Sequence, residues 1–241
     1  MENCGPLILC RGLNSTAQAN RVAALLPGPC SCHILPETLY QALPRNMIMG
    51  KTTKEISKRK MHIMDATLEL VSSVGLLRTT ISKISEQAKC SPGIVYHHFK
   101  SKEEIVNLLY ESIFEEMMDY VVSDNDQAHL FLERFKGLWI RTYDYHLNNP
   151  MKTVFLEQFK NSSYYTEEME AVTAKHLKVF MEMGKADIEA GNIAMLPFEV
   201  IQAMTWDVAK NLARAHAKAG VRLDESTLDM VAARSCSSVT A

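Results

Sequence analysis

The stretch Thr79–Lys102, TTISKISEQAKCSPGIVYHHFKSK, constrains the fold of this 241-residue chain more than any other. Ser91-Pro92 predicts a helix start, because a serine oxygen can accept from the free N–H groups of the first turn and proline there forfeits no hydrogen bond. Ser101-Lys102-Glu103-Glu104 has the pattern of a capping box and predicts the next helix start. Only about two and a half helical turns fit between these two starts. So short a helix is unstable alone, so it needs packing behind it and a partner for its polar face.

Charge is distributed unevenly along the chain. The net charge is −2 overall, but +1 over residues 1–50, +6 over 51–102 and −9 over 103–241. A basic segment joined to an acidic body predicts contact with a polyanion through the basic part. The alternative is an ordinary solvated lysine face.

The composition, 47% hydrophobic and 22% charged, is typical of a globular protein with a real core. No apolar run approaches the roughly 18–20 residues that a membrane span needs. The start, MENCGPLILCRG, lacks a basic region and Arg11 interrupts its apolar stretch, so it does not resemble a secretion signal. We expect a cytoplasmic protein without a membrane partner.

The six cysteines form no framework for disulfides or metal. Cys30-Ser31-Cys32-His33 has metal-binding residue types, but no second pair stands at a ligand-like spacing. We therefore predict free thiols in a reducing compartment, no metal site and no cofactor. The cysteines are Cys4, Cys10, Cys30, Cys32, Cys90 and Cys236.

The sequence predicts an all-α fold with four segments. Residues 1–50 are an N-terminal extension rich in helix-breaking prolines, and residues 1–46 are either a disordered arm or the product of a mis-assigned translation start. Residues 51–102 form a three-helix helix-turn-helix domain, residues 103–234 a larger helical body, and residues 235–241 a frayed tail. No alternating strand pattern is present. Helices are expected over Lys54–Val74, from Thr79 or Thr80, from Ser101 for about six turns, over Phe131–Asn148, from Pro150 through Phe159, around Met169–Met183 until Gly191, from Pro197 to before Gly220, and from Asp224 or Ser226.

The residues of the second short helix divide into two faces. Val95 and Phe99 are spaced to point into the core, with Ile94 partly inward, whereas Pro92, Gly93, Tyr96, His97 and Lys100 remain outside. Two short helices with a third behind them form the arrangement that places one helix in the DNA major groove. Gly93 permits close backbone approach, and Tyr96 and His97 can donate to phosphate oxygens.

Several motifs at fixed spacing resemble the N-terminal domain of TetR-type (TetR/AcrR) transcriptional repressors. They are Ile63-Met64-Asp65-Ala66, Gly75, Thr79-Thr80-Ile81, Ile84, Ser91-x-Gly93-x-Val95-Tyr96-His97-His98-Phe99 and Lys102-Glu103-Glu104-Ile105. The resemblance covers roughly residues 55–105, and beyond it is architectural only. Lys89 stands where the family usually has glycine, and Cys90 where it has an aliphatic residue. A left-handed Lys89 would cost about 1 kcal/mol.

The resemblance implies a ligand-responsive regulator, a repressor or else an activator, which binds a near-palindromic double-stranded DNA operator as a homodimer and is released by a small-molecule inducer. When bound to DNA it would be associated with the nucleoid. Residues 103–234 would be the ligand-binding and dimerisation domain, and the dimer would form through Pro197–Lys218 and Asp224–Arg234. The implied DNA-binding residues are Thr80, Ser91, Pro92, Gly93, Ile94, Tyr96, His97, Lys100 and Lys102.

The aromatic residues of the body either line an inducer pocket or form a plain core. The candidate pocket residues are Phe135, Trp139, Tyr143, Phe159, Tyr165, His176 and Phe180. The −9 charge of residues 103–241 favours a neutral or cationic ligand.

An enzyme is not expected, and no catalytic residues are assigned. Asp144-x-His146 and His97-His98 are the nearest acid–base sets, and neither has a nucleophile or third ligand at a useful spacing. The alternative to a DNA-binding regulator is an all-α small-molecule-binding or interaction protein whose basic lobe is only solvated.

Overall fold

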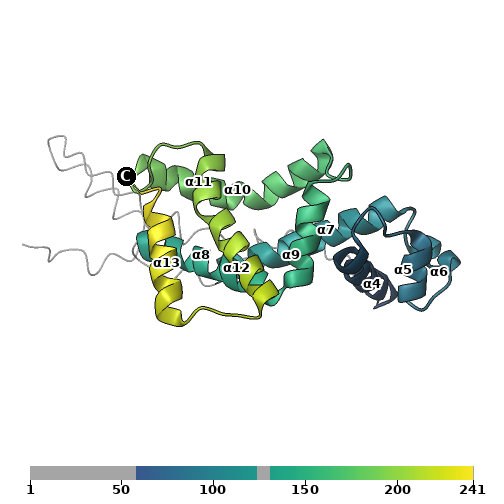
Figure 1. The fold of residues 1–241 in the computed structure, drawn as a ribbon. Coiled ribbons are helices and arrows are strands. Elements are labelled where there is room, and N and C mark those ends of the chain that lie inside the picture. Colours follow the sequence, from purple (N-terminus) through teal and green to yellow (C-terminus); the bar gives the residue numbers. More distant parts are fainter. Residues whose placement is uncertain (1–57, 124–130, 241) are drawn as a thin grey trace, which may run out of the picture. The chain divides into compact units, whose positions relative to one another are not determined.

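The computed structural model describes residues 58–123 and 131–240 (Figure 1). The predicted extension 1–50 lies outside the described residues. The all-α fold is confirmed, since the described part contains ten helices and one isolated antiparallel bridge between Ile193 and Thr240. The helices are α4 (Lys58–Val74), α5 (Ile81–Gln87), α6 (Pro92–His98), α7 (Lys102–Val122), α8 (Phe131–Asn148), α9 (Pro150–Lys160), α10 (Glu167–Glu189), α11 (Phe198–Met204), α12 (Trp206–Ala219) and α13 (Glu225–Ser237).

Local sequence signals set most helix boundaries. Gly75 has φ +90° and Gly220 has φ +66°, so both stop a helix in the left-handed conformation that glycine tolerates best. Asp224 caps α13 by accepting a hydrogen bond from the Thr227 N–H at 3.0 Å. None of the described helices has the length and apolar character needed to cross a bilayer.

Two apolar clusters hold the described helices together. The first runs without a break from α4, α5 and α6 into α7, α9 and the start of α10, and includes Val95, Phe99 and Phe159. The second joins α8 to α12 and α13, where the Trp139 indole N–H donates to Ser235 Oγ at 3.0 Å. The helix-turn-helix segment formed by α4, α5 and α6 therefore shares its core with the larger domain.

The single helix expected after Pro197 is interrupted at Thr205, which has φ −119° and ψ −82° and separates α11 from α12. The interruption frees the Met204 carbonyl, which accepts a hydrogen bond from the Ser235 hydroxyl at 2.8 Å. Thr205 is fully buried and its hydroxyl donates to the Ile201 carbonyl at 2.6 Å. A partner 31 residues away thus stabilises a break that the local sequence does not signal.

The tail is ordered as far as Thr240, so the expectation that residues 235–241 fray is wrong for the described part. Helix α13 continues to Ser237, and the side chains of Cys236 and Val239 are completely buried. The Val239 carbonyl accepts a hydrogen bond from the Ala194 N–H at 2.8 Å. Burial also raises the pKa of the Cys236 thiol to about 12. Apolar side chains in this short tail therefore fasten it to the loop between α10 and α11.

We predict that Val239→Ala lowers the free energy of unfolding by about 1–3 kcal/mol, because it removes buried methyl groups and leaves a cavity. Urea denaturation measures this loss. Val221→Ala, at a half-exposed valine, is the control and should change stability by less than about 0.5 kcal/mol. Equal, small effects of both substitutions would mean that the tail is frayed in solution.

Candidate nucleic-acid interface and ligand cavity

The turn between α5 and α6 places Lys89 in the left-handed backbone conformation, which is unfavourable for residues other than glycine. Thr80 caps α5, with its hydroxyl oxygen accepting from the Lys83 N–H at 3.4 Å. Lys89 then has φ +48°, in the left-handed region, and the Cys90 N–H donates to the Ser85 carbonyl at 2.9 Å. A lysine there costs about 1 kcal/mol relative to glycine, a strain that the packed turn tolerates.

Helix α6 is anchored by two side chains and exposes the rest. Val95 is fully buried and Phe99, which follows the helix, is 2% exposed, as their spacing predicts. Tyr96 is 57% exposed and Ile94 is 37% exposed. The other predicted DNA-binding residues that lie exposed are Thr80, Ser91, Pro92, Gly93, His97 and Lys100. The structure therefore brings the α6 candidates together on one open face.

The predicted serine cap of α6 is not formed by the side chain. Ser91 occupies the N-cap position, but its hydroxyl makes no capping hydrogen bond. Its backbone carbonyl instead accepts from the N–H groups of Ile94 at 3.0 Å and Val95 at 3.3 Å. The Ile94 N–H, one of the donors that an N-cap side chain ordinarily satisfies, is therefore bonded to the backbone instead.

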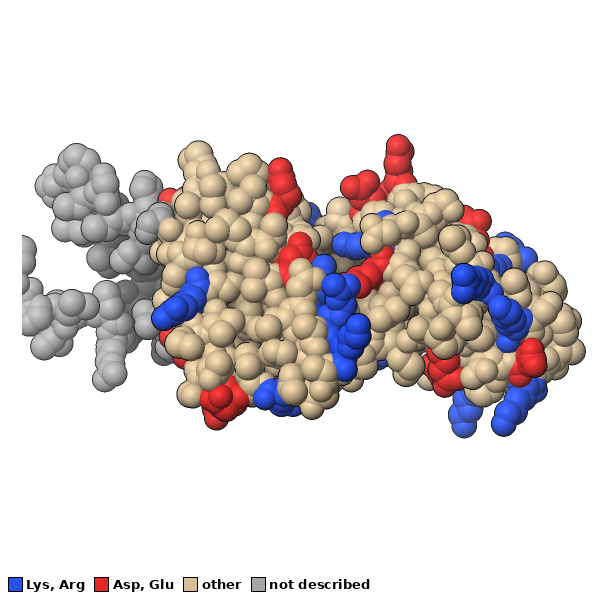
Figure 2. All heavy atoms as spheres, viewed as in Figure 1, with Lys and Arg blue, Asp and Glu red and all other residues tan. Residues whose placement is uncertain are grey.

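Basic side chains of α4 lie close to a histidine of α6. Partial burial lowers the pKa of His98, and the neighbouring His97, Lys60 and Arg59 lower it further. Lys60 Nζ also lies 5.3 Å from the centre of the Phe99 ring. In Figure 2, Lys and Arg atoms gather over the end formed by α4, α5 and α6, with a few Asp and Glu atoms between them. Such a surface attracts a polyanion such as the DNA backbone.

Lys102 differs from the other predicted contacts because its ammonium group is already engaged. Its Nζ donates to the Leu76 carbonyl at 2.6 Å and lies 5.2 Å from the centre of the Tyr164 ring. Half-buried Lys102 thus fastens the start of α7 to the loop after α4. This gives Lys102 a structural role that the sequence did not indicate.

The capping box at the start of α7 is only half formed. The Ser101 hydroxyl oxygen accepts from the Glu104 N–H at 3.1 Å, as expected. The Glu104 carboxylate, however, accepts from the Lys100 N–H at 2.6 Å instead of returning to Ser101. The carboxylate therefore fixes the backbone that leads from α6 into α7.

A cavity of about 290 Å³ lies among α7, α8, α9, α10, α11 and α12. One part of its lining is apolar and the other carries charged and amide side chains. The lining residues are Phe114, Met117, Met118, Val121, Thr142, His146, Thr153, Leu156, Glu157, Lys160, Asn161, Leu177, Phe198, Gln202, Trp206, Asp207 and Lys210.

The predicted pocket residues that are described do not line this cavity. Trp139 and Tyr143 are buried in the second core cluster, and Phe135 lines a separate cavity of about 160 Å³. Phe159 and Tyr165 pack around Tyr110, and His176 lies edge-on to Phe114 at 5.9 Å between ring centres. The side chain of Phe180 lies outside the described residues. Of the predicted pocket residues, Trp139, Tyr143 and Phe159 are thus fully buried in the core.

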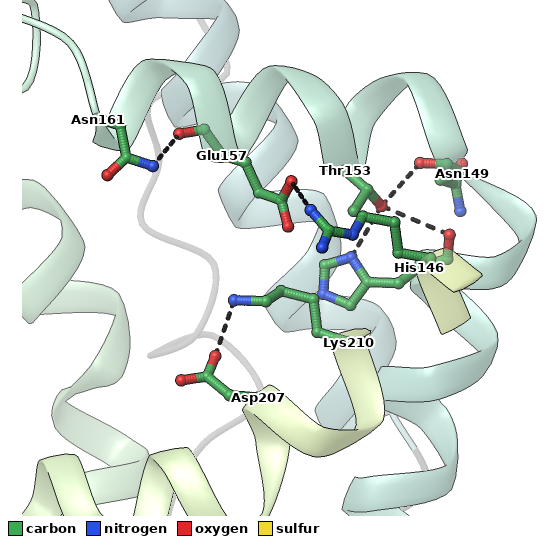
Figure 3. Close-up of polar contacts among 8 residues, drawn as sticks. His146, Asn149, Thr153, Glu157, Asn161, Asp207 and Lys210 are labelled. Atoms are coloured by element: carbon green, nitrogen blue, oxygen red, sulfur yellow. Dashed lines mark hydrogen bonds and ion pairs between the residues drawn. The ribbon is translucent and has the colours of Figure 1, made fainter. Parts of the chain in front are cut away.

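The polar wall of the cavity consists of paired side chains from α8, α9 and α12 (Figure 3). Asp207 accepts from Lys210 Nζ at 2.8 Å, and His146 Nδ1 and Thr153 Oγ1 lie 2.9 Å apart. Burial, with a contribution from Lys210, lowers the pKa of His146 to about 4. The sequence signal that was missed is the i, i+3 spacing of Asp207 and Lys210 on a helix whose Ala209 is buried.

The nearest acid–base set, Asp144-x-His146, does not form in the structure. Asp144 pairs with Arg222 at the surface, whereas His146 is buried against Thr153. Among residues 58–123 and 131–240, no three His, Cys, Asp or Glu side chains lie close enough to hold a metal ion.

Helix α9 lines the cavity and also contacts the helix-turn-helix segment. Glu157 and Lys160 line the cavity, while Gln158 Oε1 accepts from the Leu76 N–H at 2.7 Å. Gln158 Nε2 also donates to the Val71 carbonyl at 3.4 Å. One helix therefore joins the cavity wall to the C-terminal end of α4.

Comparison with known proteins agrees with this geometry. Residues 63–109 match the family described as bacterial regulatory proteins, tetR family, and residues 131–240 match a tetracyclin repressor-like C-terminal domain. An uncharacterized HTH-type transcriptional regulator of Haemophilus influenzae is 22% identical over 151 residues, 63% of this chain and 79% of the relative. The transcriptional repressor KstR2 of Mycobacterium tuberculosis is 26% identical over 96 residues, 40% of this chain and 48% of KstR2.

A solved structure of a TetR family transcription regulator from Marinobacter aquaeolei has the same fold, with a TM-score of 0.70 at 16% identity. The match covers 75% of this chain and 95% of that protein. The fold and the exposed helix α6 define a helix-turn-helix transcriptional regulator. The chain belongs to the TetR family, whose members are regulators of transcription and not enzymes.

We predict that acid destabilises the protein partly through His146. Its pKa of about 4 lies below the ordinary histidine value of 6.5, so the unfolded chain binds a proton that the folded chain excludes. His146 should therefore lower the free energy of unfolding by about 2–4 kcal/mol as the pH drops from about 6.5 to 4. Above a pH of about 6.5 it should have no effect on stability.

Denaturant unfolding at a series of pH values, for the wild type and His146→Gln, measures this contribution. The glutamine can still hydrogen-bond Thr153 but cannot gain a proton. The variant should lose less stability between pH 6.5 and 4 than the wild type. Parallel stability curves would show that His146 is protonated equally well in both states.

Proposed function

We propose that this chain is a ligand-responsive regulator, acting as a repressor, that binds a near-palindromic operator as a homodimer and leaves it when a small molecule enters the cavity. The observation that carries the proposal is the exposed face of α6, held from behind by buried Val95 and Phe99. A short helix held in this way can enter the major groove and place Tyr96 and His97 on the DNA. Matched relatives named as transcriptional regulators and a repressor support the same reading.

Exposed apolar side chains on α11, α12 and α13 support a dimer. Val208 and Met204 are each 38% exposed, and Met230 is 48% exposed. On α12, exposed Val208, Asn211 and Ala215 follow an i, i+3, i+7 spacing along one face. Small residues such as Ala215 permit close approach of a second helix pair. Two copies would present α6 to successive major grooves about 34–36 Å apart.

The ligand response is assigned to α9. A ligand in the cavity would contact Glu157 or Lys160, and a shift of α9 would reach the end of α4 through the Gln158 hydrogen bonds. Because α4, α5 and α6 share one core, a movement of α4 would change the position of α6. A difference in affinity of about 1–3 kcal/mol between the two arrangements suffices to release DNA.

We predict that Tyr96→Ala combined with Lys100→Ala weakens binding to DNA from the region upstream of the protein's own gene by at least about tenfold, because both exposed side chains contact the backbone. Fluorescence anisotropy measures the affinity. The melting temperature should be unchanged, since neither side chain is buried.

Lys175→Ala, at an exposed lysine of α10, serves as the matched control and should leave DNA affinity unchanged. Lys102 is kept in both proteins because its bond to the Leu76 carbonyl supports the fold. If the double variant binds DNA with unaltered affinity, α6 is not the helix that contacts the DNA. Failure of the wild type to bind would favour the alternative, an all-α ligand-binding or interaction protein.

A further inference from the structure

Two carboxylates and two lysines line the main cavity, and an arginine outside the lining pairs with one of the carboxylates. Asp207 is paired with Lys210 at 2.8 Å, and Glu157 accepts from Arg214 Nη1 at 2.9 Å. Both carboxylates at the cavity therefore have a cationic partner. Within residues 58–123 and 131–240, no carboxylate lies within ion-pair distance of Lys160, the remaining charged residue of the lining.

The Lys160 side chain is exposed, and two aromatic rings lie beside it. It is at the end of α9, open to the cavity, and its Nζ lies 6.0 Å from the ring centres of both Phe114 and Tyr165. The surrounding protein lowers the pKa of Lys160, and the nearby Lys210 lowers it further, against the opposing effect of Asp207. A negative group brought into the cavity would relieve both effects.

Several other lining residues provide an apolar surface next to the Lys160 ammonium. Helix α7 contributes Phe114, Met117, Met118 and Val121, and Leu177 of α10 adds to the same apolar lining. Methionine side chains are flexible and polarizable, so they adapt to the shape of a hydrocarbon. The Gln202 amide lies in the lining as well and can donate a hydrogen bond.

We propose that the cavity binds a small amphipathic anion, with one negative head group on the Lys160 ammonium and an apolar body against the α7 side chains. The proposal rests on the ligand-responsive function above and names the chemical class of the ligand. The volume of about 290 Å³ lies at the small end of ligand pockets, about 300–1,000 Å³, which favours a body of medium length. A cationic ligand would have to displace Lys210 or Arg214 from its carboxylate.

This assignment differs from the neutral or cationic ligand that the −9 charge of residues 103–241 suggests. Ligand preference depends on the charges that face the cavity, and acids on the outer surface are screened from it by water and salt. At the cavity wall the two carboxylates are paired and one lysine is left.

The test is isothermal titration calorimetry of the full-length protein with three probes of equal chain length: octanoate, octan-1-ol and octylamine. Octanoate should bind with a stoichiometry of one per chain and at least about tenfold more tightly than the alcohol or the amine, because a charge-assisted hydrogen bond replaces an unpaired charge. Lys160→Met should weaken octanoate binding by at least about tenfold, whereas Lys160→Arg should retain most of it.

Lys175→Met, at an exposed lysine outside the cavity lining, is the matched control and should bind octanoate like the wild type. Binding of octylamine or octan-1-ol as tight as that of octanoate would overturn the anionic class but leave a ligand-binding cavity. Unchanged octanoate binding by Lys160→Met would also overturn it. If no probe binds while the same samples bind DNA, the proposed class of ligand is wrong, but the proposed DNA binding is supported.

Discussion

The structure depends on one apolar core that runs from the helix-turn-helix into the larger domain. Val95 and Phe99 anchor α6 in the same cluster that contains Phe114, Met118 and Leu156, which also line the main cavity. A seven-residue helix has no stability of its own in water, so its position is set by this packing. The helix proposed to read DNA and the proposed ligand site therefore rest on shared side chains.

Polar contacts give that shared core a defined geometry. Gln158 of α9 bonds the backbone of Leu76 and Val71, and Lys102 of α7 bonds the Leu76 carbonyl. The short loop after α4 is thus held by one helix that lines the cavity through Lys160 and by another that lines it through Phe114. Such discrete hydrogen bonds favour two alternative arrangements over gradual bending, which is what a switch requires.

Local signals in the sequence were enough to predict the helical fold and the faces of α6. Caps such as Thr80 and Asp224 act within three residues, and Val95 and Phe99 follow helical periodicity. The break at Thr205 depends on Ser235, and the order of the tail depends on the loop before α11, so neither is visible in a local pattern. Lys102 was assigned to DNA on sequence spacing, and its partner Leu76 lies 26 residues away.

The proposed ligand site was harder to predict for a related reason. Aromatic side chains such as Trp139 and Tyr143 fill the core because their large area favours burial. The cavity is instead lined by charged residues, Lys160, Asp207 and Lys210, whose significance depends on which helices face each other. Packing between helices decides which helices face each other, whereas sequence periodicity predicts only which face of each helix is buried.

The central claim is that α6 and the basic residues around it bind the phosphate backbone of DNA. The most direct measurement is the affinity of the unmodified protein for the DNA upstream of its own gene as a function of salt concentration. We expect log Kd to rise linearly with log salt, with a loss of roughly a thousandfold or more between about 50 and 200 mM salt, as for a protein that contacts several phosphates. An affinity that hardly changes over this range would contradict the account.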